Sequence, residues 1–484
     1  MRILVVGMTV LSMAWVVTSA EPAGAAPDAS PTPVRKVAKL PAWRASLNVG
    51  QWIRFPNSHL SEAKWPDHPD RDPRNKGWRN GEHAKISAFA GVNLAPLTNH
   101  IVAHSSGRGC SLGNDIQAFN LMLDDPVWEF WQAPTKYDDL AMVAVNVKDP
   151  RIVNLPPDEQ TQNLDRSPRP THVGHNAAVI GDKFVRFDPG LPGEGDGGFY
   201  TTEGPRSSDR TWVWDITANL ALPAEKRQWS VDPRFKNPVK DWHYAAGANL
   251  YGDGYWYLVR SDGSLRWKPG LETLEKSNIP PNNKVWQVSR DPAFAIDHKR
   301  DRALVISGNA GKFPGTDGPS GGFMPLTGGN KPGVRPIYVD DPSQPGAKNE
   351  FCRWHKKENG ASMIGSRWFM TYCGDLDVYF MFKNYQLVDN DNGAFESVWQ
   401  FSPLPEDENT LVVKLLWGNP KSAAPWVAER GAGQPKDVCT WKGDIPGPGY
   451  SGTYRKAVWV KDLAGIALVG QSVWFFATGT PPAR

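Results

Sequence analysis

The clearest pattern in this chain lies in residues 293–308, which read Ala293-Phe294-Ala295-Ile296-Asp297-His298-Lys299-Arg300-Asp301-Arg302-Ala303-Leu304-Val305-Ile306-Ser307-Gly308. An apolar run leads into a charged turn, and a second apolar run over 303–306 ends at a glycine. Apolar and β-branched side chains pack on a sheet, whereas charged side chains at a turn stay hydrated. The stretch therefore predicts a β-hairpin with a solvated tip.

The same hairpin pattern recurs at three other places in the chain. In each, two short apolar strands flank a turn that contains Asn or Asp. The expected strand pairs are 87–92 with 100–103, 176–180 with 183–187, and 456–460 with 466–470. Such recurrence is typical of a fold built from repeated sheets.

A further strand with alternating aromatic residues follows several of these hairpins, and in two cases a Trp lies beyond it. The expected aromatic strands are 114–121, 209–216, 335–340 and 472–476. A hairpin, a glycine turn, an aromatic strand and an outer strand form one four-stranded blade of a β-propeller. Because each blade packs against two neighbours, we expect tryptophans to fill the layers between blades. They are Trp128, Trp212, Trp214, Trp229 and Trp474.

These features together resemble the kelch-type repeats of the galactose oxidase central-domain superfamily. The resemblance covers roughly residues 80–480. The chain departs from the kelch pattern where the paired glycine after the second strand is replaced by Ser105-Ser106-Gly107 and Ser307-Gly308. Insertions at 187–208 and 309–334 also lengthen the repeats. The resemblance implies an all-β propeller of four-stranded blades over residues 43–484, and we expect seven blades, with six as the alternative.

The composition agrees with an all-β chain and argues against nucleic-acid binding. The 22 Trp, 46 Gly and 43 Pro favour strands and tight turns over long helices. The net charge is only +3, and no run of five like charges occurs. A nucleic-acid-binding protein would carry a basic stripe or patch.

The first 26 residues have the pattern of an export signal. Arg2 precedes an apolar run from Ile3 to Val17, and Ala23-Gly24-Ala25 offers a small-residue cleavage site. A membrane anchor is the alternative, but the apolar run is shorter than the roughly 20 residues that a span needs. We expect a flexible leader over 27–42, an extension draped over the domain to about residue 80, and a secreted or periplasmic protein without a membrane span after signal removal.

Four cysteines in an exported chain favour disulfides, although four cysteines allow three pairings. Cys352 and Cys373 are close enough in sequence to link strands of one blade. Cys110 and Cys439 would then join the first and last blades, which are neighbours in a closed ring. No CxxC spacing indicates a structural zinc site.

No catalytic motif of high specificity is present, so the candidate site rests on the expected position of loops. Propellers place ligands at the mouth of the central channel, and polar residues just before or after the hairpins would line it. The candidates are His104, Arg108, Asn114, Asp115, His172, His175 and Asn309. They would donate hydrogen bonds to a sugar hydroxyl or a carboxylate. The alternative is that they cap turns or occupy satisfied polar niches.

No cofactor is expected, with copper and calcium kept as alternatives. The copper site of galactose oxidase needs two Tyr, two His and a Cys crosslink, but the adjacent Tyr372 and Cys373 lie in no matching motif. The run 389–393 carries alternating oxygen ligands, yet its twelfth position is Gln400 instead of the Glu of an EF-hand. A solvated turn explains this run equally well.

Two classes of function follow from this sequence. The first is a monomeric binding module that recognises a glycan or a protein partner through one rim, because loop insertions vary specificity without disturbing a scaffold. The second is an extracytoplasmic polysaccharide lyase or glycoside hydrolase, whose paired carboxylates are brought together in space and leave no linear motif.

Overall fold

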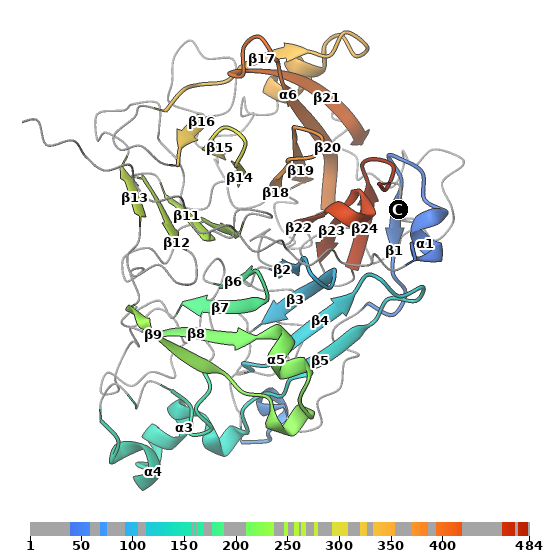
Figure 1. Ribbon diagram of the computed structural model, residues 1–484. Coiled ribbons are helices and arrows are strands. Elements are labelled where there is room, and N and C mark those ends of the chain that lie inside the picture. Colours follow the sequence, from blue (N-terminus) through green and yellow to red (C-terminus); the bar gives the residue numbers. More distant parts are fainter. Residues whose placement is uncertain are drawn as a thin grey trace, which may run out of the picture. The chain divides into compact units, whose positions relative to one another are not determined.

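The computed structural model describes residues 39–58, 68–74, 92–104, 113–156, 159, 162–168, 177–187, 210–236, 246–249, 256–260, 263–267, 275–278, 293–307, 320–326, 333–353, 369–385, 394–418, 457–469 and 473–482. Strands dominate this part of the chain, and the helices are short (Figure 1). The α-helices are α1 (Ala42–Ala45), α3 (Ala141–Asn146), α4 (Pro150–Val153), α5 (Ile216–Leu220) and α6 (Ala347–Arg353). No helix among these residues has the length and apolar character needed to cross a membrane.

The first three sheets each contain four consecutive antiparallel strands. One is β2 (Val92–Ala95), β3 (His100–His104), β4 (Ile116–Asn120) and β5 (Trp128–Gln132). The next is β6 (Ala177–Ile180), β7 (Lys183–Phe187), β8 (Arg210–Asp215) and β9 (Ser230–Lys236). The third is β10 (Ala246–Asn249), β11 (Trp256–Arg260), β12 (Gly263–Trp267) and β13 (Glu275–Asn278).

The other three sheets differ in strand number. Three strands, β14 (Ala293–Asp297), β15 (Arg302–Ser307) and β16 (Ser320–Pro325), form one sheet. Five form the next, β17 (Ile337–Asp340), β18 (Phe369–Cys373), β19 (Val378–Tyr385), β20 (Ala394–Pro403) and β21 (Thr410–Gly418). The last contains β1 (Trp52–Arg54), β22 (Ala457–Val460), β23 (Gly465–Val469) and β24 (Val473–Ala477).

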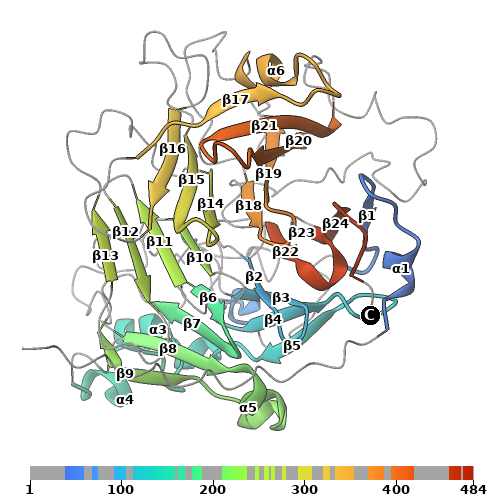
Figure 2. The same ribbon diagram turned by 45° about the horizontal axis from the view of Figure 1, so that its top comes forward.

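The innermost strands of the sheets form a closed circle. Contacts run from β2 to β6, β10, β14, β18 and β22, and β22 returns to β2 (Figure 2). This is the β-propeller that the repeated hairpins predicted. Hairpins were correctly predicted at 293–308, 176–187 and 456–470. In the remaining one the described first strand is Val92–Ala95, paired with His100–His104.

The expected number of blades is wrong. Five sheets contain the four strands of a complete blade, and the sheet of β14 to β16 has three in the described part of the chain, so neither seven nor six complete blades is found. The reason lies partly in residues 335–340, expected as an aromatic third strand. Only Val334 bridges to Phe323 on β16, and the chain then leaves as β17 to pair in parallel with β21 of the next blade.

The N-terminal extension closes the ring. Residues Trp52–Arg54 pair with β24, so the last blade combines three strands from the C-terminal end with one from the N-terminal end. This corrects the expectation that the extension only drapes over the domain. Trp52 is fully buried on this strand. The pairing covers the edge of β24, which would otherwise be an open template for another strand.

The hydrophobic core is divided into layers between neighbouring blades. On β3, Ile101 and Ala103 pack toward the last blade, whereas Val102 faces the blade of β6 to β9. Both faces of such a strand are apolar because both are covered. Trp131 and Trp214 stack across one of these layers with ring centroids 5.7 Å apart. All five tryptophans that were predicted to fill the core are buried.

The expected disulfide between Cys352 and Cys373 is absent. Cys352 lies on α6 in the layer between the β14 and β18 blades, whereas Cys373 ends β18 in the layer between the β18 and β22 blades. The two thiols therefore occupy opposite faces of one sheet, and no disulfide joins them. Burial raises the pKa of the Cys373 thiol to about 12. Cys110 and Cys439 lie outside the described residues.

The tip of the 293–308 hairpin is less solvated than its charges suggested. Asp297 is fully buried, and Arg302 is only 9% exposed. The cause is the neighbouring blade, because Tyr379 on β19 donates a hydrogen bond to Asp297. Lys299 keeps its side chain more than half exposed, as expected for a turn.

Candidate functional site

Contacts between blades show which turns share a face of the ring. Asn99 in the β2–β3 turn donates to Asp462 in the β22–β23 turn at 2.9 Å. Lys461 in that same turn bonds Asp375 in the β18–β19 turn at 2.8 Å. We call this side, where short turns meet, the turn face.

The opposite side is the loop face, and it receives the longest connections. Because antiparallel strands alternate in direction, β3, β7 and β19 end there. Among the strands that the structure describes, the longest connections are 55–91, 133–176, 188–209, 341–368 and 419–456, and each begins and ends at strand ends on the loop face. In a propeller, the sequence and length of such connections can vary most easily without disturbing the sheets.

Three of the predicted site residues are described, and all lie at the loop face. His104 ends β3, and Asn114 and Asp115 lead into β4. Each of the three is at most 3% exposed. Arg108, His172, His175 and Asn309 lie outside the described residues, as does the 389–393 run considered for calcium.

His104 joins two neighbouring blades through defined hydrogen bonds. Its Nε2 lies 3.1 Å from Nη1 of Arg186 on β7. Its Nδ1 lies 3.0 Å from the backbone oxygen of Asp115. A guanidinium only donates, so Nε2 accepts and the neutral ring donates from Nδ1. His104 thereby ties the start of β4 to the next blade.

Asp115 holds a second part of the same buried cluster. Its Oδ2 accepts a hydrogen bond from Gln117 at 2.9 Å, and its Oδ1 lies 3.5 Å from His68 Nε2. His68 and Asp115 both have fully buried side chains. A Cβ at position 113 would lie 2.3 Å from His68 Nε2 and 2.7 Å from Asp115 Oδ1, so any residue larger than glycine would displace one of these side chains. The 55–91 connection is thus anchored at the start of β4.

Two polar atoms near His104 have no hydrogen-bond partner in the described part of the chain. They are Oε1 of Gln117 and Nε1 of Trp229, which are both buried. The Trp229 ring lies 5.1 Å from the His104 ring, measured between centroids. Buried polar atoms are normally satisfied, so such atoms suggest a bound water or ligand group.

Asn114 has a structural role. Its side-chain nitrogen donates to Thr135 Oγ1 at 2.9 Å and to Ser167 Oγ at 2.7 Å, and its Oδ1 accepts from the Thr135 backbone N–H. Asn163 donates to the same two hydroxyl oxygens. Asn114 therefore pins the 133–168 segment to β4, which agrees with the alternative that such residues cap turns.

The described cluster contains no metal site. No group of three or more His, Cys, Asp or Glu side chains in the described residues is arranged to hold an ion. The His104–Asp115–Arg186 cluster instead supports the strand ends on both sides of residues 105–112 through the two hydrogen bonds of His104. The cluster therefore has a structural role as a rigid polar platform, because its hydrogen bonds fix the strand ends at the loop face.

Sequence reasoning missed His68, Arg186 and Gln117. Arg186 sits in a predicted strand and alternates like an ordinary outward-facing residue. His68 is remote in sequence and has no motif around it. Only the packing of one blade against the next brings these residues to His104 and Asp115. The strand also contains the charged Lys183, so the charge at Arg186 did not distinguish it as a buried residue.

Comparison with known proteins does not assign this chain to a family. No protein family profile and no curated protein sequence matches the chain. Among solved structures, YCF48 from Cyanidioschyzon merolae is similar at 10% identity with a TM-score of 0.31, covering 88% of this chain and 99% of that protein. The tricorn protease is similar at 8% identity with a TM-score of 0.16, covering 63% of this chain and 29% of the protease chain. The β-propeller assignment therefore rests on strand pairing and sheet order.

Proposed function

We propose that this protein is an exported, kelch-like β-propeller that binds a glycan or a protein partner through the loop face. One observation carries the proposal, namely that the longest connections between described strands all leave strand ends at that face. The buried His104–Asp115–Arg186 cluster supports it by holding two blades together directly below. A rigid scaffold with variable connections suits recognition better than a flat sheet surface.

Glycan is the favoured ligand class because the loop-face candidates are hydrogen-bond donors of the kind that sugar hydroxyls accept. They include Arg108, His172 and His175. His104 and Asp115 are at most 3% exposed and hold the adjoining strand ends. Export follows from the signal-like residues 1–26. The protein would act outside the cytoplasm as a monomer, with a disulfide between Cys110 and Cys439 as part of the same proposal.

A glycan array with the mature protein, residues 27–484, tests this function. We expect binding to at least one class of extracellular polysaccharide. Replacing residues 188–209 by a short Gly-Ser linker should weaken that binding at least about tenfold, which is roughly 1.4 kcal/mol. The matched control is Leu97→Ser in the β2–β3 turn of the turn face, where Leu97 is 43% exposed.

The outcomes of this experiment separate the alternatives. Equal loss of binding in the Leu97→Ser variant would argue against a loop-face site. Silence on every glycan would reject the glycan half of the proposal and leave a protein partner. Release of soluble oligosaccharide would assign the protein to the polysaccharide-acting enzymes instead.

A further inference from the structure

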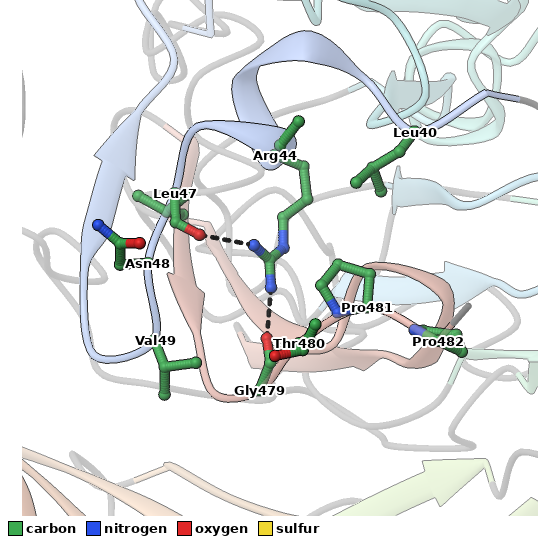
Figure 3. A pocket seen from close by; sticks show the side chains of 10 residues that line it. Leu40, Arg44, Leu47, Asn48, Val49, Gly479, Thr480, Pro481 and Pro482 are labelled. Carbon is green, nitrogen blue, oxygen red and sulfur yellow. Dashed lines mark hydrogen bonds between the residues drawn. The ribbon is translucent and has the colours of Figure 1, made fainter. Parts of the chain in front are cut away.

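A pocket of about 510 Å³ opens on the turn face, away from the proposed glycan site. It is formed where α1 and the residues before β1 meet the residues after β24. Its walls are largely apolar, and Arg44 lies among them (Figure 3). The apolar wall residues include Leu40, Leu47, Val49, Pro481 and Pro482. This volume lies within the usual range for small-molecule sites.

Arg44 is only 2% exposed, and its partners are backbone oxygens. Nε donates to Leu463 O at 2.5 Å, Nη1 to Leu47 O at 2.9 Å and Nη2 to Gly479 O at 2.6 Å. A longer contact of 3.5 Å joins Nη2 to Ala464 O. Figure 3 shows the guanidinium between Leu47 and Gly479, with Pro481 beside it.

The charge of Arg44 has no counter-ion in the described part of the chain. Four of its five N–H groups face carbonyl oxygens, and the remaining N–H on Nη1 has no acceptor among the described residues. Burial lowers the pKa of Arg44, and no carboxylate opposes that effect. Carbonyl dipoles offset only part of the cost of burying a cation.

A ligand carboxylate would supply what this pocket lacks. It would bring a negative charge beside the buried guanidinium and an acceptor oxygen for the one N–H of Arg44 Nη1 that has no acceptor among the described residues, and such a charge-assisted hydrogen bond is stronger than a neutral one. The apolar walls would cover the rest of such a ligand. A neutral or cationic ligand would leave the buried charge uncompensated, and a strongly hydrated anion would gain nothing from proline and leucine side chains.

We propose that this pocket binds a small amphipathic carboxylate, with the carboxylate against Arg44 and the apolar body along Val49 and Pro481. The site is independent of the proposed glycan function and lies on the opposite face of the ring. Because Arg44 also bonds Leu463 and Gly479, ligand binding would strengthen the junction between the N-terminal and C-terminal ends of the propeller.

Isothermal titration of the mature protein with acetate, benzoate and 4-phenylbutyrate tests the proposal, with 4-phenylbutan-1-ol as the neutral control. We expect affinity to rise with the apolar body and to fall about tenfold or more when the carboxylate becomes an alcohol, as expected for a charge-assisted hydrogen bond. Equal affinity for acid and alcohol, or no binding of any of the three acids, would overturn the proposal.

Two variants locate the binding. Arg44→Met should abolish the preference for acid over alcohol, but it also removes the bonds to Leu463 and Gly479 and thereby destabilises the fold, so a second variant is needed. Val49→Trp fills the pocket from a side chain that is 59% exposed, so the fold should be kept. We expect it to weaken 4-phenylbutyrate binding at least about tenfold with an unchanged far-ultraviolet spectrum. Unchanged binding in a folded Val49→Trp protein would place the carboxylate elsewhere.

Discussion

Asp297 illustrates how single residues hold the blades of this propeller together. Its fully buried carboxylate accepts a hydrogen bond from Tyr379 of the next blade, and its Oδ2 lies 3.1 Å from Arg300 Nη1 and 3.3 Å from Arg302 Nε. Burial, and then the charge of Asp297, raise the pKa of Tyr379 well above its usual value. The hydroxyl therefore stays protonated and keeps donating.

Replacing Arg302 by Met tests the energetic weight of this cluster. The change removes the guanidinium, whose Cζ lies 3.6 Å from the centroid of the Phe323 ring, and leaves Asp297 with one cation fewer in a buried site. We expect a loss of about 3 kcal/mol in the free energy of unfolding, measured by urea denaturation. The matched control is Lys299→Met on the same turn, whose exposed ion pair with Asp377 should contribute less than about 1 kcal/mol. Equal effects of the two changes would contradict this account.

Glu129 on β5 gives a pH-dependent prediction. Burial alone would raise its pKa, but hydrogen bonds from His100, Asn120 and Trp131 outweigh burial and lower the pKa from 4.5 to about 2. A carboxyl whose pKa is lower in the folded state stabilises the fold above its unfolded pKa, and this contribution disappears as the pH falls toward 2. The difference in unfolding free energy between the native protein and Glu129→Gln should therefore be larger at pH 6 than at pH 3.

Urea denaturation at the two pH values measures this difference. The control is Glu225→Gln, because Glu225 is exposed and forms no such hydrogen bonds among the described residues. A gap between native protein and Glu129→Gln that stays constant with pH would show that the hydrogen bonds to Glu129 do not stabilise its charged form.

At the scale of elements, β1 matters most, because a strand of three residues closes the ring. Trp52 on this strand is fully buried against Phe382 and Phe476, from two different blades. Replacing Trp52 by Ala should cost about 3–5 kcal/mol in unfolding free energy, as for other large buried side chains. A thermal or urea transition followed by tryptophan fluorescence measures this cost.

Two truncated chains distinguish the contribution of the whole β1 strand to stability from that of Trp52 alone. A chain that begins at residue 39 keeps β1 and α1 and should melt like the mature protein. A chain that begins at residue 56 exposes the edge of β24 and the apolar layer below it, so we expect association or a much lower melting temperature. Identical melting of the two chains would show that β1 is dispensable for closure.

For the whole molecule, the layers between blades determine which cysteines can form a disulfide. Cys352 and Cys373 lie in different inter-blade layers. Peptide mapping of the unreduced, denatured protein should therefore find no link between them. A Cys352–Cys373 peptide pair would contradict the packing described above. The same map tests the proposed Cys110–Cys439 pair.

Features within one blade could be predicted from the sequence. The hairpins at 176–187 and 293–308 are close in sequence, and their apolar runs and polar turns specify the pairing directly. Contacts between blades could not be predicted from the sequence. The segment 335–340 has the sequence of an aromatic strand, yet it pairs in parallel with β21, and its pattern contains no sign of that partner. The candidate site divides in the same way, since His104 and Asp115 flank one hairpin but Arg186 belongs to another blade.

The amino-acid sequence alone determined that this chain forms β-hairpins with tryptophan-rich strands, because alternation of apolar side chains along a strand is a local property. Only the tertiary structure decided that β1 completes the last blade, that two cysteines lie on opposite faces of one sheet, and that Arg44 is buried with no counter-ion among the described residues. Each of these depends on which sheets become neighbours when the ring closes, and an alternating pattern does not specify the neighbour.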